Sequence, residues 1–407
     1  MNAVFWQPRN QPFALRAIAL TGGVATGLVF GLGLATTGAG AQDSTLSVAT
    51  WGGAYGQSQE IAFFEPFAKE TGTAISTEIY DGSLAKLKSL IDTGDSVDVV
   101  DVSAGTLATL CGDGLLEAIE VSSLGAPPDG QSIEEDFIDG GLSSCGVASV
   151  AWSTAIAFNR RAFPKGEPTA ISALLDTARF PGKRALPKNP RYTLELAMLA
   201  DGVPAGSVYT ELATEAGVDR AFAALDKIKG DILFWDKAGE PVTWLLEKKV
   251  TMAAGYNGRI FRAAVGDQRR IGVLWDGQIY DIDAWAIPKT ARNKKEAMRF
   301  ISFATSPARL AAQAQLIAYG PMRKSALPLV GKHPIIGVDM QDFLPTAPDN
   351  FKTALKFDAA WWDEHGAALS QRFDAWRAPI EAEAAAKEAE RKAKEAKAKA
   401  PVSKAAP

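Results

Sequence analysis

The sequence predicts an α/β fold with open, parallel sheets in two successive parts of the chain. Short β-branched stretches alternate with amphipathic helical stretches between residues 46 and 102, which is the pattern of a parallel sheet covered by helices. The apolar, β-rich stretch 147–158 follows as a crossing between two lobes, and residues 160–280 then repeat the alternation. With 407 residues the chain is long enough for two domains.

Composition excludes several classes of function. The formal net charge is −4, and Lys and Arg form no cluster interleaved with aromatic residues, so nucleic acid is not an expected partner. The chain has two histidines, His333 and His365, and two cysteines. A zinc site needs several such residues together, and neither histidine has the neighbours of a catalytic triad. We therefore expect no metal, no cofactor and no enzymatic activity.

The first 41 residues have the pattern of a secretion signal. Arg9 and Arg16 precede the apolar, glycine-rich stretch 17–35, and Ala39-Gly-Ala41 is an A-x-A cleavage pattern. An uncleaved membrane anchor is the alternative, but the many glycines and the cleavage pattern favour removal. We expect a periplasmic protein that is cleaved after Ala41.

The expected export of the protein bears on whether its two cysteines are oxidised or reduced. In an oxidising compartment Cys111 and Cys145 are expected to form a disulfide, with two buried free thiols as the alternative. On the chain-entropy model, closing the loop between them contributes about 3–4 kcal/mol.

The first part of the body is expected to hold strands at 46–50, 74–80 and 97–102, with helices near 61–71 and 84–91. In open α/β sheets, ligands bind beyond the carboxyl ends of the strands. The glycine-rich turn with Trp51 and Tyr55, and the turn that begins at Ser103, occupy such positions. These three residues are therefore candidates for ligand contact.

The second part of the body continues the same alternation. We expect helices at 194–200, 218–228, 294–305 and 307–318, and strands at 232–235 and 250–255. From about residue 379 the composition changes to Ala, Glu and Lys, which predicts a solvated single helix that frays into disorder. We assign no chemistry to this tail, residues 381–407.

The strand at 279–288 carries the most informative pair of residues. Because strand side chains alternate, Asp281 and Asp283 share one face. Two carboxylates in an otherwise apolar strand are costly to bury without a partner. The partner is either an Arg or Lys of the protein itself, at a strand end, or a bound cation.

Four motifs in order resemble the solute-binding proteins of bacterial ABC transporters, most closely the spermidine/putrescine-binding type. The motifs are Trp51-Gly-Gly-Ala-Tyr55, Val97-Asp-Val-Val-Asp101, Tyr256-Asn-Gly-Arg259 and the strand 279–288. The resemblance covers about 46–376. It implies two α/β lobes, joined by crossing strands, that close on a ligand. It also implies a monomer that delivers a small cationic, polyamine-like ligand to a membrane permease, without chemistry on that ligand.

The resemblance and the crossing strands suggest a division of the chain. We expect a first lobe at 42–149, with 284–320 returning to it. The second lobe is expected at 150–283, with 321–380 returning to it.

The resemblance also assigns site residues. The family's cleft positions fall on Trp51, Ser103, Tyr256, Asp283, Tyr319 and Trp362. Tyr55 joins them as part of a possible aromatic cage for an amine, and Asp281 stands where the family often has tryptophan. The family's second-lobe acidic patch is replaced by the basic segment 188–192, with Glu195 as the nearest acid. Trp152 and Trp235 are interpreted as structural by default.

Three alternatives remain open. If Arg259 is free, it could clasp a carboxylate bidentately, which would favour a zwitterionic or carboxylate ligand on the same fold. An exported enzyme on a two-lobed scaffold ranks low, because the sequence offers no base–nucleophile constellation. A binding module that signals to a membrane sensor has the same sequence features as one that feeds a permease.

Overall fold

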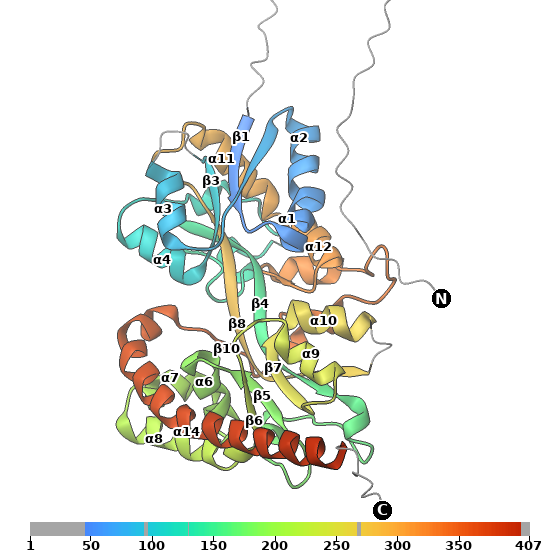
Figure 1. The fold of residues 1–407 in the computed structure, drawn as a ribbon. Helices are drawn as coiled ribbons and strands as arrows, with labels where there is room; N and C mark the ends of the chain where they lie inside the picture. The colour runs from blue at the N-terminus through green and yellow to red at the C-terminus, as the bar shows by residue number, and fades with distance from the viewer. Residues whose placement is uncertain (1–44, 93–96, 129, 267–269, 400–407) are drawn as a thin grey trace, which may run out of the picture. The chain divides into compact units, whose positions relative to one another are not determined.

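A computed structural model of the protein describes residues 45–92, 97–128, 130–266 and 270–399 (Figure 1). The predicted signal sequence (1–41), its cleavage position after Ala41 and the end of the tail (400–407) lie outside the described residues. None of the helices described is both long enough and apolar enough to cross a membrane.

The described strands form one ten-stranded mixed sheet. Its main path runs β2-β1-β3-β8-β4-β7-β5-β6, with β9 beside β4 and β10 beside β8. The strands are β1 (Thr45–Thr50), β2 (Ala74–Ile79), β3 (Val99–Ser103), β4 (Gly146–Asn159), β5 (Arg184–Pro187), β6 (Ile232–Trp235), β7 (Met252–Tyr256), β8 (Ile271–Ala286), β9 (Gly320–Pro321) and β10 (Leu355–Lys356).

Helices connect and cover these strands. They are α1 (Gly53–Gln59), α2 (Glu65–Thr71), α3 (Leu84–Asp92), α4 (Ala104–Gly112), α5 (Ile133–Asp136), α6 (Pro190–Ala200), α7 (Val208–Leu212), α8 (Glu215–Asp226), α9 (Glu240–Leu246), α10 (Asn257–Gly266), α11 (Lys294–Ala304), α12 (Pro307–Leu316), α13 (Pro348–Phe351) and α14 (Ala359–Lys399). A π-helical turn at Glu60–Phe64 joins α1 to α2, so the predicted helix near 61–71 begins earlier and contains a bulge.

The sheet is parallel at its two ends and antiparallel in its centre. β1 pairs in parallel with β2 and β3, and β5 pairs in parallel with β6 and β7. In the centre, β8 pairs antiparallel with β3 and β4, and β4 pairs antiparallel with β7. The prediction of a parallel sheet in each of the two parts is therefore confirmed, and the antiparallel centre is formed by the strands that cross between them. The long strand β4 leads out of the first lobe and β8 leads back, so the two run in opposite directions (Figure 1).

Buried side chains divide the described chain into two lobes. One hydrophobic core gathers around β1–β3 and the helices α11 and α12, and further cores gather around β5–β7 with α6, α8 and α10. One part of the predicted division needs correction: buried residues between Met322 and Ala347 pack in the first core, whereas those between Leu355 and Phe373 pack in the second. Only the latter segment returns to the second lobe, and the other boundaries remain as proposed.

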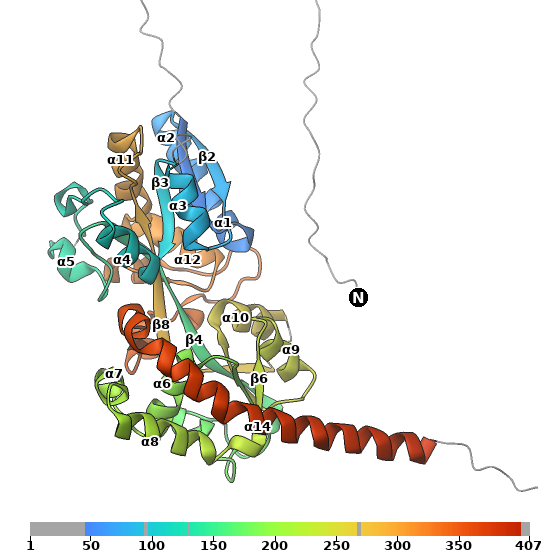
Figure 2. The same ribbon diagram turned by 60° about the vertical axis from the view of Figure 1, so that its left-hand side comes forward.

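The last helix, α14, belongs to the second lobe and then continues into the tail (Figure 2). Its first part packs through Trp362 and Phe373, which are almost fully buried. Between Glu381 and Lys394 its side chains are largely exposed, with ion pairs such as Glu383–Lys387 and Glu390–Lys394 one turn apart. The predicted solvated helix is thus described as far as Lys399.

Candidate functional site

Two carboxylates of β8 lie at the centre of the sheet. Asp281 is opposite Trp152 of β4, and Asp283 is opposite Ser103 of β3, so the alternation that places both aspartates on one face holds. Each is more than nine-tenths buried. Asp283 Oδ1 accepts a long hydrogen bond from the Trp152 indole N–H at 3.4 Å, and Asp281 Oδ1 accepts one from the backbone N–H of Ile282 at 2.8 Å.

A third carboxylate, Asp101 of β3, lies beside them. Asp101 is opposite Trp285, so it is a diagonal neighbour of Asp283 on the same face of the sheet. It is fully buried, and its Oδ2 accepts a hydrogen bond of 2.6 Å from Gln59 Nε2. Sequence reasoning missed this residue, although the alternation Val97-Asp-Val-Val-Asp101 placed an acid inside a buried strand.

None of these three carboxylates forms an ion pair in the described part of the chain. Surface acids such as Asp113 do, and the buried Asp136 pairs with Arg323 at 2.6 Å. Burial raises the pKa of Asp281 to about 6 and that of Asp101 to about 7. Burial, and then the charges of Asp101 and Asp281, raise the pKa of Asp283 well above its usual range. The interpretation that an Arg or Lys of the strand end pairs with Asp281 and Asp283 is therefore wrong for the described residues.

Aromatic donors of the first lobe surround Asp101. The Tyr80 hydroxyl donates to the Asp101 backbone carbonyl at 2.7 Å, and the Trp51 ring packs against Tyr80 with centroids 5.2 Å apart. The Trp51 indole nitrogen and the Tyr55 hydroxyl are buried without a hydrogen-bond partner, as is Asp101 Oδ1. Both donors are nevertheless near enough to lower the pKa of Asp101. The predicted Trp51 and Tyr55 therefore belong to the surroundings of the carboxylates.

Charges of opposite sign act on Tyr319. Its ring is 5.7 Å from that of Tyr55. Burial and then the charge of Asp283 raise the pKa of the Tyr319 hydroxyl to about 12, while the charge of Arg259 opposes this shift. Arg259 also lowers the pKa of Tyr256, which burial raises. Arg259 is exposed, and it makes no hydrogen bond or ion pair with the residues that the structure describes.

A cavity of about 590 Å³ opens beside Asp281, between the two lobes. Ser103 and Thr106 of the first lobe line it, together with Tyr256 and Asp281. The Ser103 hydroxyl also caps α4 by accepting from the backbone N–H of Thr106. Among the predicted site residues, Ser103, Tyr256 and Asp281 therefore line this cavity directly.

Two tryptophans that were interpreted as structural also line the cavity. Trp152 and Trp235 both contact the ring of Tyr256 edge-on, with centroids 5.6 and 5.9 Å away. Trp152 reaches the cavity because it lies on β4 directly opposite Asp281. Sequence patterns gave no indication of this, because a tryptophan in an apolar strand is more often a core residue.

The second lobe contributes a basic edge to the cavity. Lys188 and Arg191 line it, each with an exposed ion-pair partner: Glu381 at 3.2 Å and Asp363 at 3.7 Å. Tyr192 also lines it, with a positive φ of 68° that is rare for a residue with a side chain. Strained backbone of this kind concentrates at functional sites.

Glu195 and Trp362, both predicted ligand contacts, lie instead in the core of the second lobe. Neither lines the cavity, and both are essentially inaccessible to solvent. Glu195 Oε1 accepts hydrogen bonds from the Trp362 indole N–H at 2.5 Å and from the Tyr209 hydroxyl at 3.2 Å. Trp361, the neighbour of Trp362 in the chain, packs against Tyr209 and does not line the cavity either. Both predictions are corrected, because Glu195 Oε1 and the Trp362 indole are bonded to each other inside the core.

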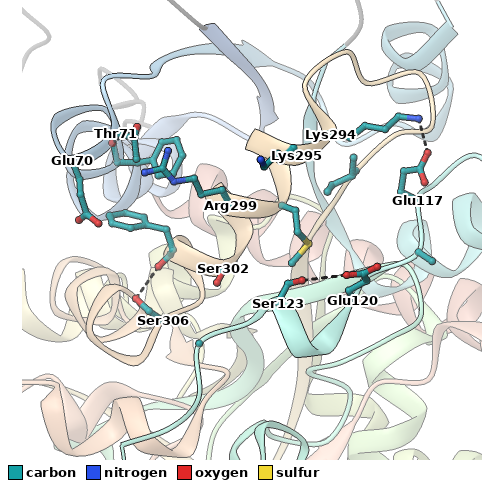
Figure 3. Close-up of a pocket in the computed structure, with 16 residues that line it drawn as sticks. Glu70, Thr71, Glu117, Glu120, Ser123, Lys294, Lys295, Arg299, Ser302 and Ser306 are labelled. Carbon is teal, nitrogen blue, oxygen red and sulfur yellow. Dashed lines mark hydrogen bonds and ion pairs between the residues drawn. The ribbon is translucent and has the colours of Figure 1, made fainter. Parts of the chain in front are cut away.

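A second cavity, of about 790 Å³, lies on the outer face of the first lobe (Figure 3). Phe67 and Met298 line it, together with the charged side chains Lys294, Lys295 and Arg299 of α11. Lys294 pairs with Glu117 at 2.7 Å, and Arg299 pairs with Glu296 at 3.4 Å. Because these cations are exposed and already paired, this surface lacks the unneutralised buried charge of the cavity between the lobes.

The remaining predictions concern cysteines and metals. Cys111 and Cys145 form the expected disulfide, with Cα atoms 5.9 Å apart, and so link α4 to the loop before β4. Among the described residues, no group of three or more His, Cys, Asp or Glu side chains is arranged to hold a metal ion.

Comparisons with known proteins place the chain among binding proteins. Residues 62–336 match the model of a family described as bacterial extracellular solute-binding protein. A gamma-aminobutyric acid-binding protein of Pseudomonas aeruginosa is 39% identical over 351 residues, which cover 86% of this chain and 95% of that protein. The spermidine/putrescine-binding periplasmic protein of Escherichia coli is 24% identical over 266 residues, or 63% of this chain and 72% of that protein.

Solved structures share the fold. The structure of a GABA receptor is 28% identical in sequence and superposes with a TM-score of 0.65 over 82% of this chain and 98% of that one.

Proposed function

The chain belongs to the family of bacterial extracellular solute-binding proteins. We propose that it captures a small zwitterion of the ω-amino-acid class, such as gamma-aminobutyrate (GABA). Its fold is the two-lobed α/β fold of periplasmic binding proteins. Its relatives are binding proteins of ABC importers rather than enzymes, and such proteins deliver small ligands to permease subunits. The proposal concerns the identity of the ligand and the residues that hold it.

The observation that carries the proposal is that Asp283 and Arg259 both act on the hydroxyl of Tyr319. Charges of opposite sign act on its hydroxyl, and neither charge has an ion-pair partner among the described residues. A ligand with an ammonium group at one end and a carboxylate at the other would neutralise both. A diamine would leave Arg259 facing a like charge.

The ammonium end fits the carboxylates of β8. Asp281 and Asp283 keep a few per cent of their surface accessible, so they can contact a ligand. The face of Trp152 or Tyr256 can add a cation–π contact, each worth about 0.5–2 kcal/mol. A few such contacts plus a charged hydrogen bond are enough for micromolar affinity, about −8 kcal/mol.

We assign the carboxylate end to Arg259. Arg259 is not among the residues that line the cavity, but its charge acts on Tyr256, which does line it. A free guanidinium can hold a carboxylate through two parallel hydrogen bonds. Arg191 and Lys188 line the cavity, but each already has an acidic partner. The predicted alternative through Arg259 is therefore the one we adopt, with Arg191 as its competitor within the same site.

Relatives support a ligand of this class. The Pseudomonas aeruginosa protein with 39% identity is a GABA-binding protein, and a solved relative with 28% identity is a GABA receptor. The polyamine-binding relative has only 24% identity. Polyamine binding, the first expectation from the sequence, remains the second candidate function because three carboxylates without a cation would also suit a diamine.

A set of four-carbon ligands tests the proposal. GABA, putrescine and butyrate have similar length and differ in their end groups, so each comparison changes one charged group. We expect GABA to raise the thermal unfolding temperature most, since a ligand at 100 times its Kd adds about 2.7 kcal/mol of stability. A larger effect of putrescine would favour the polyamine candidate, and a larger effect of butyrate would contradict the role of the aspartates.

Two matched variants locate the carboxylate end. Arg259→Gln is expected to weaken GABA binding by about 1.5–3 kcal/mol, the range for a hydrogen bond to a charged group. Arg191→Gln makes the same chemical change at an arginine that is already paired, and we expect a small effect. The reverse order would move the carboxylate end to Arg191.

A further inference from the structure

Asp101 and Asp283 form a pair of neighbouring buried carboxyl groups. They are diagonal neighbours on the antiparallel strands β3 and β8, on one face of the sheet. Asp101 is fully buried and Asp283 is 7% exposed. Two carboxylates at such a separation in a buried site repel each other strongly when both are ionised.

The groups that face the pair come from every element packed against it, and none of those in the described ranges is a cation. They are Trp51, Tyr55, Gln59, Tyr80, Trp152, Asp281 and Tyr319. The nearest acid, Asp281, adds a further negative charge. Arg259 acts on Tyr319 and Tyr256 but is not among the groups that act on either carboxyl. The pair therefore lacks a countercharge in the empty protein.

The hydrogen bonds of Asp101 show which oxygen can carry a proton. Thr50 donates its hydroxyl to Gln59 Oε1 at 2.5 Å, which leaves Gln59 Nε2 to donate to Asp101 Oδ2 at 2.6 Å. Asp101 Oδ2 is therefore an acceptor. Asp101 Oδ1 is buried without a partner, so it is the available protonation site on this residue.

We propose that Asp101 and Asp283 share a single proton in the empty protein, and that capture of the ligand's ammonium group at Asp283 releases this proton. The inference rests on the proposed function, because it needs an ammonium group at Asp283. In the step, the carboxylic O–H bond breaks and the proton passes to water. The ammonium group then donates an N–H to the Asp283 carboxylate, so the net charge of the site is conserved.

Two hydrogen-bond donors lie near the ionised Asp101 that this step produces. The buried Trp51 indole N–H and Tyr55 hydroxyl lack partners in the empty protein. Both lie near enough to Asp101 to stabilise its ionised form. Proton release therefore links ligand capture to the segment that carries Trp51 and Tyr55. Asp101 is a positioning residue in this account, since it does not touch the ligand.

Calorimetry in buffers of different ionisation enthalpy measures how many protons the protein releases when a ligand binds. With GABA at pH 6, below the pKa of about 7 to which burial raises Asp101, we expect the protein to release about one proton per ligand bound. Asp101→Asn should bind GABA and release less of the proton, with the release moved to lower pH, because the charge of Asp101 no longer raises the pKa of Asp283. Glu195→Gln is the matched control: it removes another fully buried carboxyl with a raised pKa, outside the site, and should release the same proton as the wild type.

The outcomes separate the inference from the proposed function. Binding without proton release by the wild type, or undiminished release by Asp101→Asn, overturns the inference and leaves the function intact. Failure of GABA to bind overturns the function. In that case infrared spectra of the empty protein still test the shared proton: a protonated-carboxyl band should be present in the wild type and Glu195→Gln at pH 6. It should weaken in Asp101→Asn, or in Asp283→Asn if the first variant does not fold. A band that neither variant weakens overturns the inference.

Discussion

At the scale of single residues, Asp283 lowers the folding stability of the ligand-free protein and, in the proposed function, binds the ligand. An unneutralised buried carboxyl destabilises the fold. We therefore expect Asp283→Asn to raise the unfolding temperature of the empty protein at pH 8 and to weaken GABA binding by about 2–5 kcal/mol. Thermal unfolding with and without GABA measures both effects. A variant that is less stable and still binds GABA would show that Asp283 is a structural residue.

The turn at Gly82 holds the Trp51 ring in place. Gly82 has a φ of +84°, and a Cβ added there would lie 2.4 Å from Trp51 Cζ3. Gly82→Ala should lower the free energy of unfolding by about 2–4 kcal/mol, through backbone strain and the clash together. Gly72→Ala is the control, because Gly72 has a similar φ of +76° but open space around its Cβ position. Equal losses in urea unfolding would show that Trp51 is not constrained by this contact.

The sequence predicted some site residues and missed others for identifiable reasons. Asp281 and Asp283 followed from strand alternation, which is a local property. Glu195 was assigned to the site because it was the nearest acid in the chain, yet its partners Trp362 and Tyr209 come from other helices. Asp101 became visible only when the register between β3 and β8 placed it beside Asp283.

At the scale of elements, hydrophobic periodicity predicted most helices and strands near their observed positions. The strand at 74–80 is β2 (Ala74–Ile79), and the helix at 294–305 is α11 (Lys294–Ala304). The antiparallel direction of the crossing strands could not be predicted, because periodicity does not distinguish a strand that stays in a lobe from one that crosses. The π-helical turn before α2 likewise has no signal in the hydrophobic pattern.

The helix α14 offers a test of which of its parts stabilise the second lobe. Deleting residues 381–407 removes the exposed ion pair Lys188–Glu381 and should change the free energy of unfolding by less than about 1 kcal/mol. Phe373→Ala, at a fully buried position of the same helix, should cost about 3–5 kcal/mol. Chemical denaturation compares the two. A large loss on truncation would assign the tail a structural role.

At the scale of the whole molecule, buried acids make stability depend on pH. Burial raises the pKa of Asp101 and Glu195 to about 7 and that of Asp281 to about 6. These values exceed those of the unfolded chain, near 4. The stabilisation from the protonated groups is therefore complete below about pH 4 and is lost as pH rises through 6–7.

We expect the free energy of unfolding of the ligand-free protein to fall by on the order of 5 kcal/mol between pH 5 and pH 8. Denaturant unfolding across this range measures it. Asp101→Asn and Glu195→Gln should each flatten the dependence. A stability that rises over the same range would mean that the buried acids are neutralised by groups of the protein itself.

The central claim is that one end of the ligand is an ammonium group at Asp283 and the other a carboxylate at Arg259. The most direct test is the ratio of Kd values for putrescine and GABA in the wild type and in Arg259→Glu, measured by calorimetry. The account predicts that the wild type prefers GABA and that the variant prefers putrescine, because its new carboxylate would attract the second ammonium group. An unchanged ratio would contradict it.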